Sequence, residues 1–157
     1  MIRPITPDDT AALIAIADAI GFEQNELEQL GQMFADYFDS NLETHHFCIT
    51  DDDVEPVGVA YCAPEPMTDR TWNLYLIAVH PDRQGQGRGK ALLRYVEQIL
   101  TARGERLLVV ETSGLESFEG TRTFYRKCGY EEEGRIRDFY TAGDDKIVYR
   151  KILASEG

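Results

Sequence analysis

Residues 76 to 93 read LIAVHPDRQGQGRGKALL, which predicts a strand, a turn, a glycine-rich loop and the start of a helix. Glycines occupy every second position of the loop, at 85, 87 and 89. The first N–H groups of a helix lack intrahelical partners and lie at the positive end of the helix dipole. Glycines there let an anion approach these donors, and Arg83, Arg88 and Lys90 add positive charge. The stretch therefore predicts a phosphate-binding loop.

Two common nucleotide-binding motifs do not fit this loop. A triphosphate loop requires G-x-x-x-x-G-K-[ST], but the run from Gly85 to Lys90 is one residue too short and Ala91 replaces the hydroxyl residue. The dinucleotide fingerprint G-x-G-x-x-G belongs to the first strand–helix turn, whereas Lys90 stands at its last glycine position and several elements come earlier. A purely structural turn would not require three alternate glycines, which cost backbone entropy.

Length and composition describe one domain, residues 1–157, with a sizeable core. No apolar run approaches the ~20 residues of a membrane span, and no signal peptide is apparent, so we expect a cytoplasmic protein without a membrane partner. The net charge of −12 argues against nucleic acid as a partner. An acidic surface attracts cationic partners, although solubility alone also explains it. An isologous homodimer is the commonest assembly for such a domain.

Three cysteines, Cys48, Cys62 and Cys128, are far apart and lack the spacing of metal ligands. Each lies in an apolar stretch, so we expect buried structural thiols and no metal site.

Hydrophobic periodicity along the chain predicts an α/β (α+β) fold, in which a mixed sheet is covered by helices rather than built from a strict βαβ series. We expect six to seven strands and about four helices. The helices are expected after Thr6, through 26–38, from the glycine loop to Gly104, and at 121–128. Charged or polar turns are expected at 51–53, 113–120 and 143–145. The expected strands lie at 2–5, 46–50, 57–62, 72–79, 107–110 (ending at Glu111), 133–140 and 146–153.

Two segments of the chain resemble one enzyme family. The run Gln84-Gly85-Gln86-Gly87-Arg88-Gly89 matches the Q/R-x-x-G-x-G/A signature of the GNAT superfamily of N-acetyltransferases. About 35 residues later, Phe124-Tyr125-Arg126-Lys127-Cys128-Gly129-Tyr130 is similar to the family's F-Y-x-x-x-G-F/Y segment. The resemblance covers roughly residues 56–153 and implies a single-domain GNAT-like fold that binds acetyl-CoA as the acyl donor.

The resemblance also implies how the donor would be held. Backbone groups of Ile77, Ala78 and Val79 would pair with the pantetheine arm as an added strand, and a main-chain N–H near Val79 would polarise the thioester carbonyl. Amides from Gln84 to Lys90 would hold the pyrophosphate, with Phe124 completing the donor side. The side chains of Arg83, Arg88 and Lys90 would either contact the 3′-phosphate or be solvated.

Tyr125 is the predicted general acid, because it coincides with the family tyrosine that reaches the coenzyme A sulfur. The alternative is a tyrosine that merely packs at a helix–sheet boundary. Glu111, at the predicted end of an apolar strand, is the candidate general base. A solvated strand-end glutamate is the alternative, and the rival bases are Glu23, Glu26 and Glu65.

One position departs from the family pattern. Family members often carry an Asn six positions before the F-Y phenylalanine, where it binds pantetheine, but this chain has Phe118. We expect a local substitute such as Ser117 or Thr121.

The predicted function is acetyl-CoA-dependent transfer of an acetyl group to a primary amine of a small molecule or peptide. The alternatives are a non-catalytic acyl-CoA-binding module, an acyltransferase with a longer acyl donor, and an NAD-linked enzyme. Acceptor choice is expected to depend on the N-terminal helices and on the loops near Pro64 and Phe139, which carry no recognisable motif.

Overall fold

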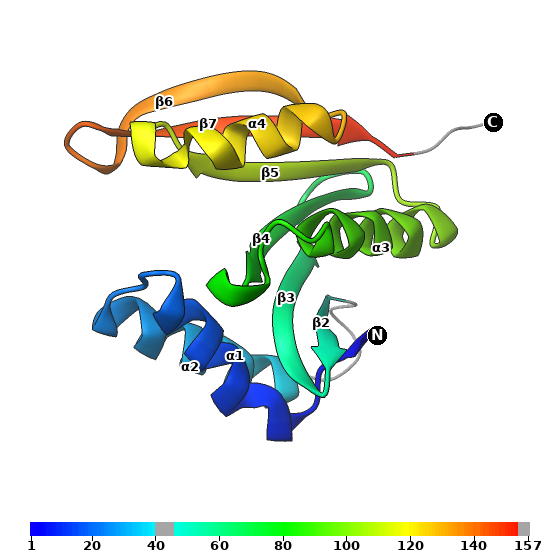
Figure 1. The fold of residues 1–157 in the computed structure, drawn as a ribbon. Helices are drawn as coiled ribbons and strands as arrows, with labels where there is room; N and C mark the ends of the chain where they lie inside the picture. Colours follow the sequence, from blue (N-terminus) through cyan, green and yellow to red (C-terminus); the bar gives the residue numbers. More distant parts are fainter. Residues whose placement is uncertain (40–45, 154–157) are drawn as a thin grey trace.

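The computed structural model describes residues 1–39 and 46–153 as a seven-stranded mixed sheet with four α-helices (Figure 1). The strand order is β1-β2-β3-β4-β5-β7-β6. This confirms the predicted fold class, strand number and helix number. The strands are β1 Ile2–Pro4, β2 Phe47–Asp53, β3 Glu55–Pro64, β4 Thr71–Val79, β5 Leu107–Ser113, β6 Glu131–Thr141 and β7 Asp144–Ile152. The helices are α1 Thr10–Ala19, α2 Gln24–Asp39, α3 Arg88–Ala102 and α4 Glu119–Lys127.

Two apolar clusters lie on opposite faces of the sheet, as alternation along each strand requires. On one face, Leu92 and Val96 of α3 pack with Leu108 of β5. On the other, Leu13 of α1 and Phe34 of α2 pack against Val59 of β3. Helices α1 and α2 thus cover only the N-terminal strands, while α4 lies along β5 and β7 (Figure 1).

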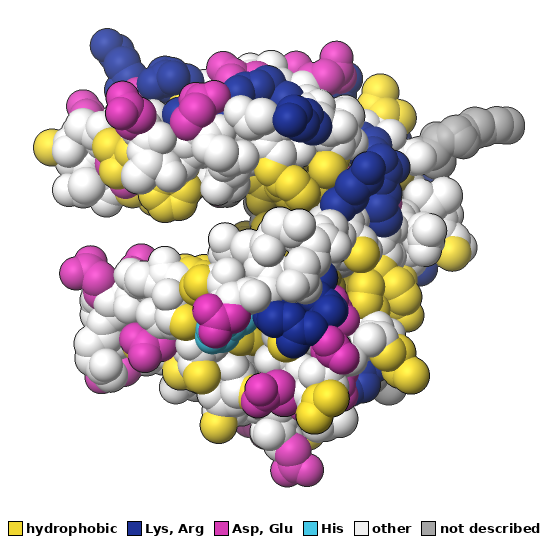
Figure 2. All heavy atoms as spheres, in the orientation of Figure 1, with side chains coloured by type: hydrophobic (Ala, Val, Ile, Leu, Met, Phe, Trp, Pro, Cys, Tyr) yellow, Lys and Arg dark blue, Asp and Glu magenta, His cyan; other side chains and the backbone are white. Residues whose placement is uncertain are grey.

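Strands β4 and β5 pair over only part of their length. Their parallel ladder joins residues 71–74 to 107–110, after which β5 continues to Ser113 beside β7. A bulge places Tyr75 outside the β3–β4 ladder, because Leu74 pairs with Cys62 and Leu76 with Tyr61. Bulges bend a strand and increase its twist, so β4 leaves β5 at this point. The molecule is deeply notched between the part carrying α4 and the part carrying α1 and α2 (Figure 2).

Helix ends follow the local sequence signals. The backbone N–H of Thr6 donates to Asp9 Oδ2 at 2.7 Å, which closes a capping box before α1. At the C-terminal ends of α1 and α4, Gly21 and Gly129 adopt φ values of 106° and 93°, the left-handed conformation that terminates helices.

Several predicted boundaries were wrong, mostly where pairing with a neighbouring strand extends a strand beyond its predicted end. Strand β2 runs through the predicted 51–53 turn, and Val54 takes the turn instead, because the β2–β3 pairing continues to Asp53. Strand β5 runs to Ser113 because β7 pairs with it throughout, so Glu111 lies inside a strand. Helix α4 begins at Glu119, inside the predicted 113–120 loop. The last hairpin pairs Thr141 with Asp144 and turns at 142–143 rather than 143–145.

The cysteines Cys48, Cys62 and Cys128 are free and buried, as predicted. Burial raises the pKa of each thiol. In the part of the chain that the structure describes, every helix is too short or too polar to cross a bilayer.

Candidate functional site

A cavity of about 630 Å³ opens where β4 leaves β5. Every predicted donor-binding residue except Gln86 lines it, and so does the predicted acid Tyr125. Four further lining residues lie on or beside α4: Gly120, Thr121, Lys127 and Cys128. The structure therefore brings the glycine-rich loop and the F-Y segment, about 35 residues apart, to one place.

The edge of β4 that faces this gap carries free backbone groups. The N–H of His80 donates to Val57 O at 2.8 Å, and bonding alternates along an antiparallel ladder. The N–H and C=O groups of Ile77 and Val79 therefore point away from β3, towards the gap. The side chain of Gln84 already donates to Val79 O at 3.0 Å. The remaining groups are placed to accept an extended ligand as an added strand.

The three loop glycines differ in how far the backbone requires them. Gly85 and Gly87 have φ values of 76° and 79°, a left-handed conformation that favours glycine. Gly87 is also the N-cap of α3. Gly89 lies within α3, where a Cβ atom would stand 3.7 Å from the Phe124 ring. The first two glycines shape the loop, whereas at the third an added Cβ atom would make only an ordinary van der Waals contact.

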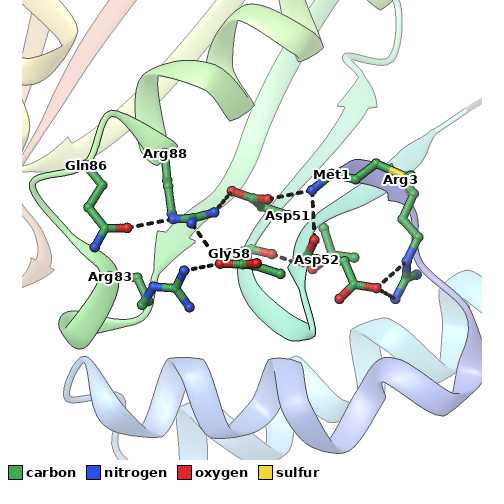
Figure 3. Close-up of polar contacts among 10 residues, drawn as sticks. Met1, Arg3, Asp51, Asp52, Gly58, Arg83, Gln86 and Arg88 are labelled. Atoms are coloured by element: carbon green, nitrogen blue, oxygen red, sulfur yellow. Dashed lines mark hydrogen bonds and ion pairs between the residues drawn. The ribbon is translucent and has the colours of Figure 1, made fainter.

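The basic side chains of the loop divide into two groups. The guanidinium groups of Arg83 and Arg88 form ion pairs with carboxylates at the end of β2 (Figure 3). Arg88 is therefore held by protein carboxylates rather than solvated. In residues 1–39 and 46–153, Lys90 and Lys127 make no ion pair, and both line the cavity.

Tyr125 is buried, with 4% of its surface exposed. Its ring packs against Phe124, Tyr130 and Tyr149, with centroid distances of 5.4, 5.9 and 5.9 Å. Within the described chain its hydroxyl has no hydrogen-bond partner, and the residue lines the cavity. Burial raises its pKa, so the phenol remains protonated and able to donate.

Glu111 does not line this cavity. Leu108 and Val110 of β5 pack on the α3 face, so alternation directs Glu111 to the opposite face. There Asn73 Nδ2 donates to Glu111 Oε2 at 3.2 Å, and Lys146 Nζ lies 3.3 Å from Glu111 Oε1. The predicted acid and base thus stand on opposite faces of the sheet.

Among the rival bases, only Glu65 lies with Glu111. Asn73 Nδ2 donates to both carboxylates, at 3.0 Å to Glu65 Oε1 and 3.2 Å to Glu111 Oε2. The hydroxyl of Tyr75 also donates to Glu65 Oε1, at 2.8 Å. Glu23 and Glu26 instead sit exposed at the start of α2, where the N–H of Glu23 donates to Glu26 Oε1.

Sequence reasoning missed three cavity-lining residues, Gly120, Lys127 and Cys128, and the two partners of Glu111, Asn73 and Lys146. For some of them the sequence carries a signal. Cavity residues on α4 recur at 121, 124, 125 and 128, which is helical spacing from Tyr125. Of the two expected substitutes near Phe118, Thr121 lines the cavity and Ser117 does not. Asn73 and Lys146 had no such signal, because only strand pairing brings them to Glu111.

The side chains that most often bind metal ions are scattered over the described residues. Across these residues, no three His, Cys, Asp or Glu side chains are grouped as metal ligands would be.

Comparison with known proteins adds independent observations. A family profile described as "Acetyltransferase (GNAT) domain" matches residues 43–132. The N-acetyltransferase 8F1 of Rattus norvegicus is 30% identical over 105 residues, which are 64% of this chain and 47% of the rat protein. The chain therefore spans about half the length of this curated relative.

Solved structures share the fold over the whole chain. A GNAT-family protein from Desulfovibrio desulfuricans is 33% identical with a TM-score of 0.92, covering 98% of this chain and 99% of its own. An aminoglycoside 6′-N-acetyltransferase complexed with coenzyme A is 16% identical with a TM-score of 0.79, covering 100% and 99%. The ribosomal-protein-S18-alanine N-acetyltransferase of Escherichia coli is 22% identical with a TM-score of 0.78, covering 100% and 96%. At these identities, the last two similarities show the fold alone.

Proposed function

The chain belongs to the GNAT acetyltransferase family, and on that premise we propose that it transfers an acetyl group from acetyl-CoA directly to a primary amine. One observation carries the proposal. Tyr125 is a buried tyrosine whose hydroxyl has no hydrogen-bond partner among the described residues, and it lines the same cavity as the glycine-rich loop and the free edge of β4. A donor held by the loop and this edge has a protonated phenol beside it.

The donor side uses backbone more than side chains. Amides of the loop from Gln84 to Lys90 bind the pyrophosphate at the start of α3, and the Ile77 and Val79 backbone groups pair with the pantetheine arm. Thr121 makes the pantetheine contact that the family asparagine makes at the position of Phe118. Lys90 and Lys127 balance the charge of the phosphates. The cavity volume of about 630 Å³ lies within the usual range for small-molecule sites.

The bond changes are those of direct acyl transfer. The donor supplies an activated thioester, and the amine nitrogen forms a C–N bond to its carbonyl carbon while the C–S bond breaks. A main-chain N–H near Val79 polarises the carbonyl oxygen. Tyr125 gives its proton to the leaving sulfur, and the excess proton on nitrogen passes to a base.

Glu111 is the proposed base, and it places the acceptor on the sheet face opposite α3 and α4. Glu65 and Glu111 share the amide of Asn73 there, so this face presents carboxylates to an incoming ammonium group. A base is needed because a lysine-like amine with a pKa of ~10.4 is only about one part in a thousand neutral near pH 7. Neighbours in fold whose names specify an aminoglycoside or a ribosomal-protein alanine as acceptor are compatible with an amine acceptor.

Replacing Tyr125 by Phe tests the proposal. We expect kcat to fall about 100-fold because the leaving thiolate loses its proton donor, while the Kd for coenzyme A stays nearly unchanged. Release of free thiol should be followed with a panel of peptides, polyamines, amino acids and aminoglycosides. Tyr95→Phe on α3, which removes a hydroxyl outside the cavity lining, is the matched control.

Other outcomes of this assay favour the alternatives. Coenzyme A binding by the wild-type protein without turnover on any amine would favour a binding module. Faster turnover with longer acyl donors would favour a different acyltransferase. An unchanged kcat in Tyr125→Phe would remove Tyr125 as the acid.

A further inference from the structure

We propose that Asp51 and Asp53, at the end of β2, position the glycine-rich loop for donor binding by holding Arg88 and Arg83. This inference rests on the proposed function, because the donor is the coenzyme A assigned to that loop. In this arrangement Arg88 is a positioning residue that acts through the loop backbone, and it does not contact phosphate itself.

Each of the three nitrogens of the Arg88 guanidinium group donates to a protein oxygen (Figure 3). Nη1 donates to Asp51 Oδ2 at 2.9 Å, Nη2 to Asp53 Oδ2 at 3.0 Å, and Nε to Gln86 Oε1 at 2.8 Å. Only 22% of the Arg88 side chain is exposed. Charge-assisted bonds in this fixed fork define both position and orientation, and they use three of the five N–H groups of Arg88.

Both carboxylates belong to strand β2, which pairs with β3 up to Asp53. Asp51 is buried, with 8% of its side chain exposed, and pairs with Gly58 in the β2–β3 ladder. A bulge follows between Asp51 and Asp52, and Thr50 Oγ1 donates to Gly58 O at 2.6 Å. The Asp51 carboxylate therefore belongs to the paired sheet and not to the loop that it holds.

Asp53 joins the two ends of the loop. Its Oδ2 accepts from both Arg83 and Arg88, which flank residues 84–87. This four-residue segment contains Gly85 and Gly87, the two glycines in left-handed conformation. Glycine loses more backbone freedom on ordering than any other residue. Ion pairs at both ends of the segment restrict the loop in the free protein, so less conformational entropy is lost when the donor binds. Arg88 is also the first residue of α3, where the helix amides begin.

Charge pairing identifies which cations remain for the donor. The carboxylates of Asp51 and Asp53 neutralise Arg83 and Arg88. In the described chain, Lys90 and Lys127 are the lining cations without an ion pair. The two roles make different predictions for Asp51. If Arg88 positions the loop, loss of Asp51 weakens donor binding. If Arg88 binds phosphate, loss of Asp51 frees a cation and leaves binding equal or tighter.

A double-mutant cycle with Asp51→Asn, Arg88→Gln and the double variant distinguishes these roles. The Kd for coenzyme A should be measured by titration calorimetry. We expect each single variant to bind roughly 10-fold more weakly, since each loses a charge-assisted hydrogen bond. The double variant should bind coenzyme A no more weakly than whichever single variant has the higher Kd, because both substitutions break the same Arg88–Asp51 interaction. Unchanged or tighter binding by Asp51→Asn, or additive losses, would overturn the proposal.

A second measurement does not depend on the donor. Hydrogen exchange of amides 84–90 in the ligand-free protein should become faster in Asp51→Asn and Arg88→Gln. The control is Asp69→Asn, which breaks the exposed Arg70–Asp69 ion pair at 3.1 Å elsewhere on the surface, and it should change neither exchange in the loop nor Kd. Equal loop exchange in wild type and variants would also overturn the proposal.

The two readouts separate this inference from the proposed function. If the wild-type protein binds no coenzyme A, the proposed function fails, and exchange in the loop still decides whether the aspartates order it. Should Asp51→Asn fold poorly, Asp53→Asn takes its place in both measurements, because 46% of the Asp53 side chain is exposed and its loss disturbs no core.

Discussion

At the scale of single residues, charged side chains with the same sign do different things because their partners differ. Arg88 and Lys90 are two positions apart in one basic loop. Arg88 forms ion pairs with Asp51 and Asp53, whereas Lys90 lines the cavity without an ion pair in the described chain. The sequence predicts a positive island around the glycines. It does not predict this division, because the partners come from β2, more than 30 residues earlier.

The same limit applies to the predicted catalytic pair. Tyr125 could be placed from its segment, because the glycine that ends α4 and the helical spacing of 121, 124 and 125 orient one face of a short helix. Glu111 was placed at a strand end, yet β5 continues past it because β7 pairs along its whole length. A one-residue change of register reverses the face of a strand side chain, so sequence alone could not tell on which side Glu111 lies.

Asp9 gives a prediction for the pH dependence of stability. Arg3 donates to both of its carboxylate oxygens, at 2.8 and 2.9 Å, and this bonding lowers the pKa of Asp9 from 3.8 to about 2. A lowered folded-state pKa stabilises the fold at pH above the unfolded value and ceases to do so as pH falls through the folded value. We therefore expect about 2 kcal/mol of stability from Asp9 at neutral pH, lost progressively between about pH 4 and pH 2.

Urea unfolding of wild type and Asp9→Asn measures this contribution. The free energies of unfolding should differ by about 2 kcal/mol near pH 6 and converge below about pH 2. A difference that stays constant across this range would show that the substitution acts through packing rather than through ionisation.

At the scale of secondary structure, signals within an element were predictable and boundaries set between elements were not. The capping residues around Thr6 and the glycines after α1 and α4 act locally, so the helix positions followed from the sequence. The ends of β2 and β5 depend on the ladders of β3 and β7. The bulge at Tyr75, which separates β4 from β5, is likewise a property of the β3–β4 pairing and has no local sequence signal.

Gly58 lies where β3 meets α3, and its replacement by Ala should destabilise the protein. An added Cβ atom would stand 2.9 Å from Leu92 Cδ1 and 3.3 Å from Ala78 O. Leu92 is fully buried, and the carbonyl belongs to β4, so neither yields easily. Overpacking of this kind costs about 1–3 kcal/mol, which thermal or urea unfolding would detect.

Gly31→Ala is the matched control, with the opposite expected sign. Gly31 lies within α2, and its added Cβ would meet only Ile14 Cδ1 at 3.9 Å. Alanine should therefore stabilise the helix by up to about 1 kcal/mol. If both variants changed stability equally, the close contact at Gly58 would not be the cause.

At the scale of the whole molecule, the net charge of −12 has two explanations, solubility and attraction of a cationic acceptor. Two carboxylates in the structure are placed where they could attract a cationic acceptor. Glu65 and Glu111 lie together on the sheet face away from α3, and in the described chain Glu65 is bound only by the neutral donors Asn73 and Tyr75. A carboxylate without a cationic partner at the proposed acceptor face favours a substrate that carries a second positive charge.

The salt dependence of turnover separates the two explanations. A diamine acceptor and a matched hydroxyalkylamine, which replaces the second ammonium group by a hydroxyl, should be compared between about 0.05 M and about 0.5 M NaCl. Over this range the Debye length falls from ~14 Å to ~4 Å, so attraction of the second ammonium group is screened. We expect kcat/KM to fall several-fold more steeply for the diamine.

Glu65→Gln should remove most of this difference in salt dependence, whereas Glu28→Gln on the exposed side of α2 changes the net charge equally and should preserve it. The comparison works because both variants alter the long-range field by one charge, and only one alters the acceptor face. Equal salt slopes for the two acceptors in the wild-type protein would mean that the acidic surface serves solubility and that the Glu65–Glu111 pair does not select the substrate.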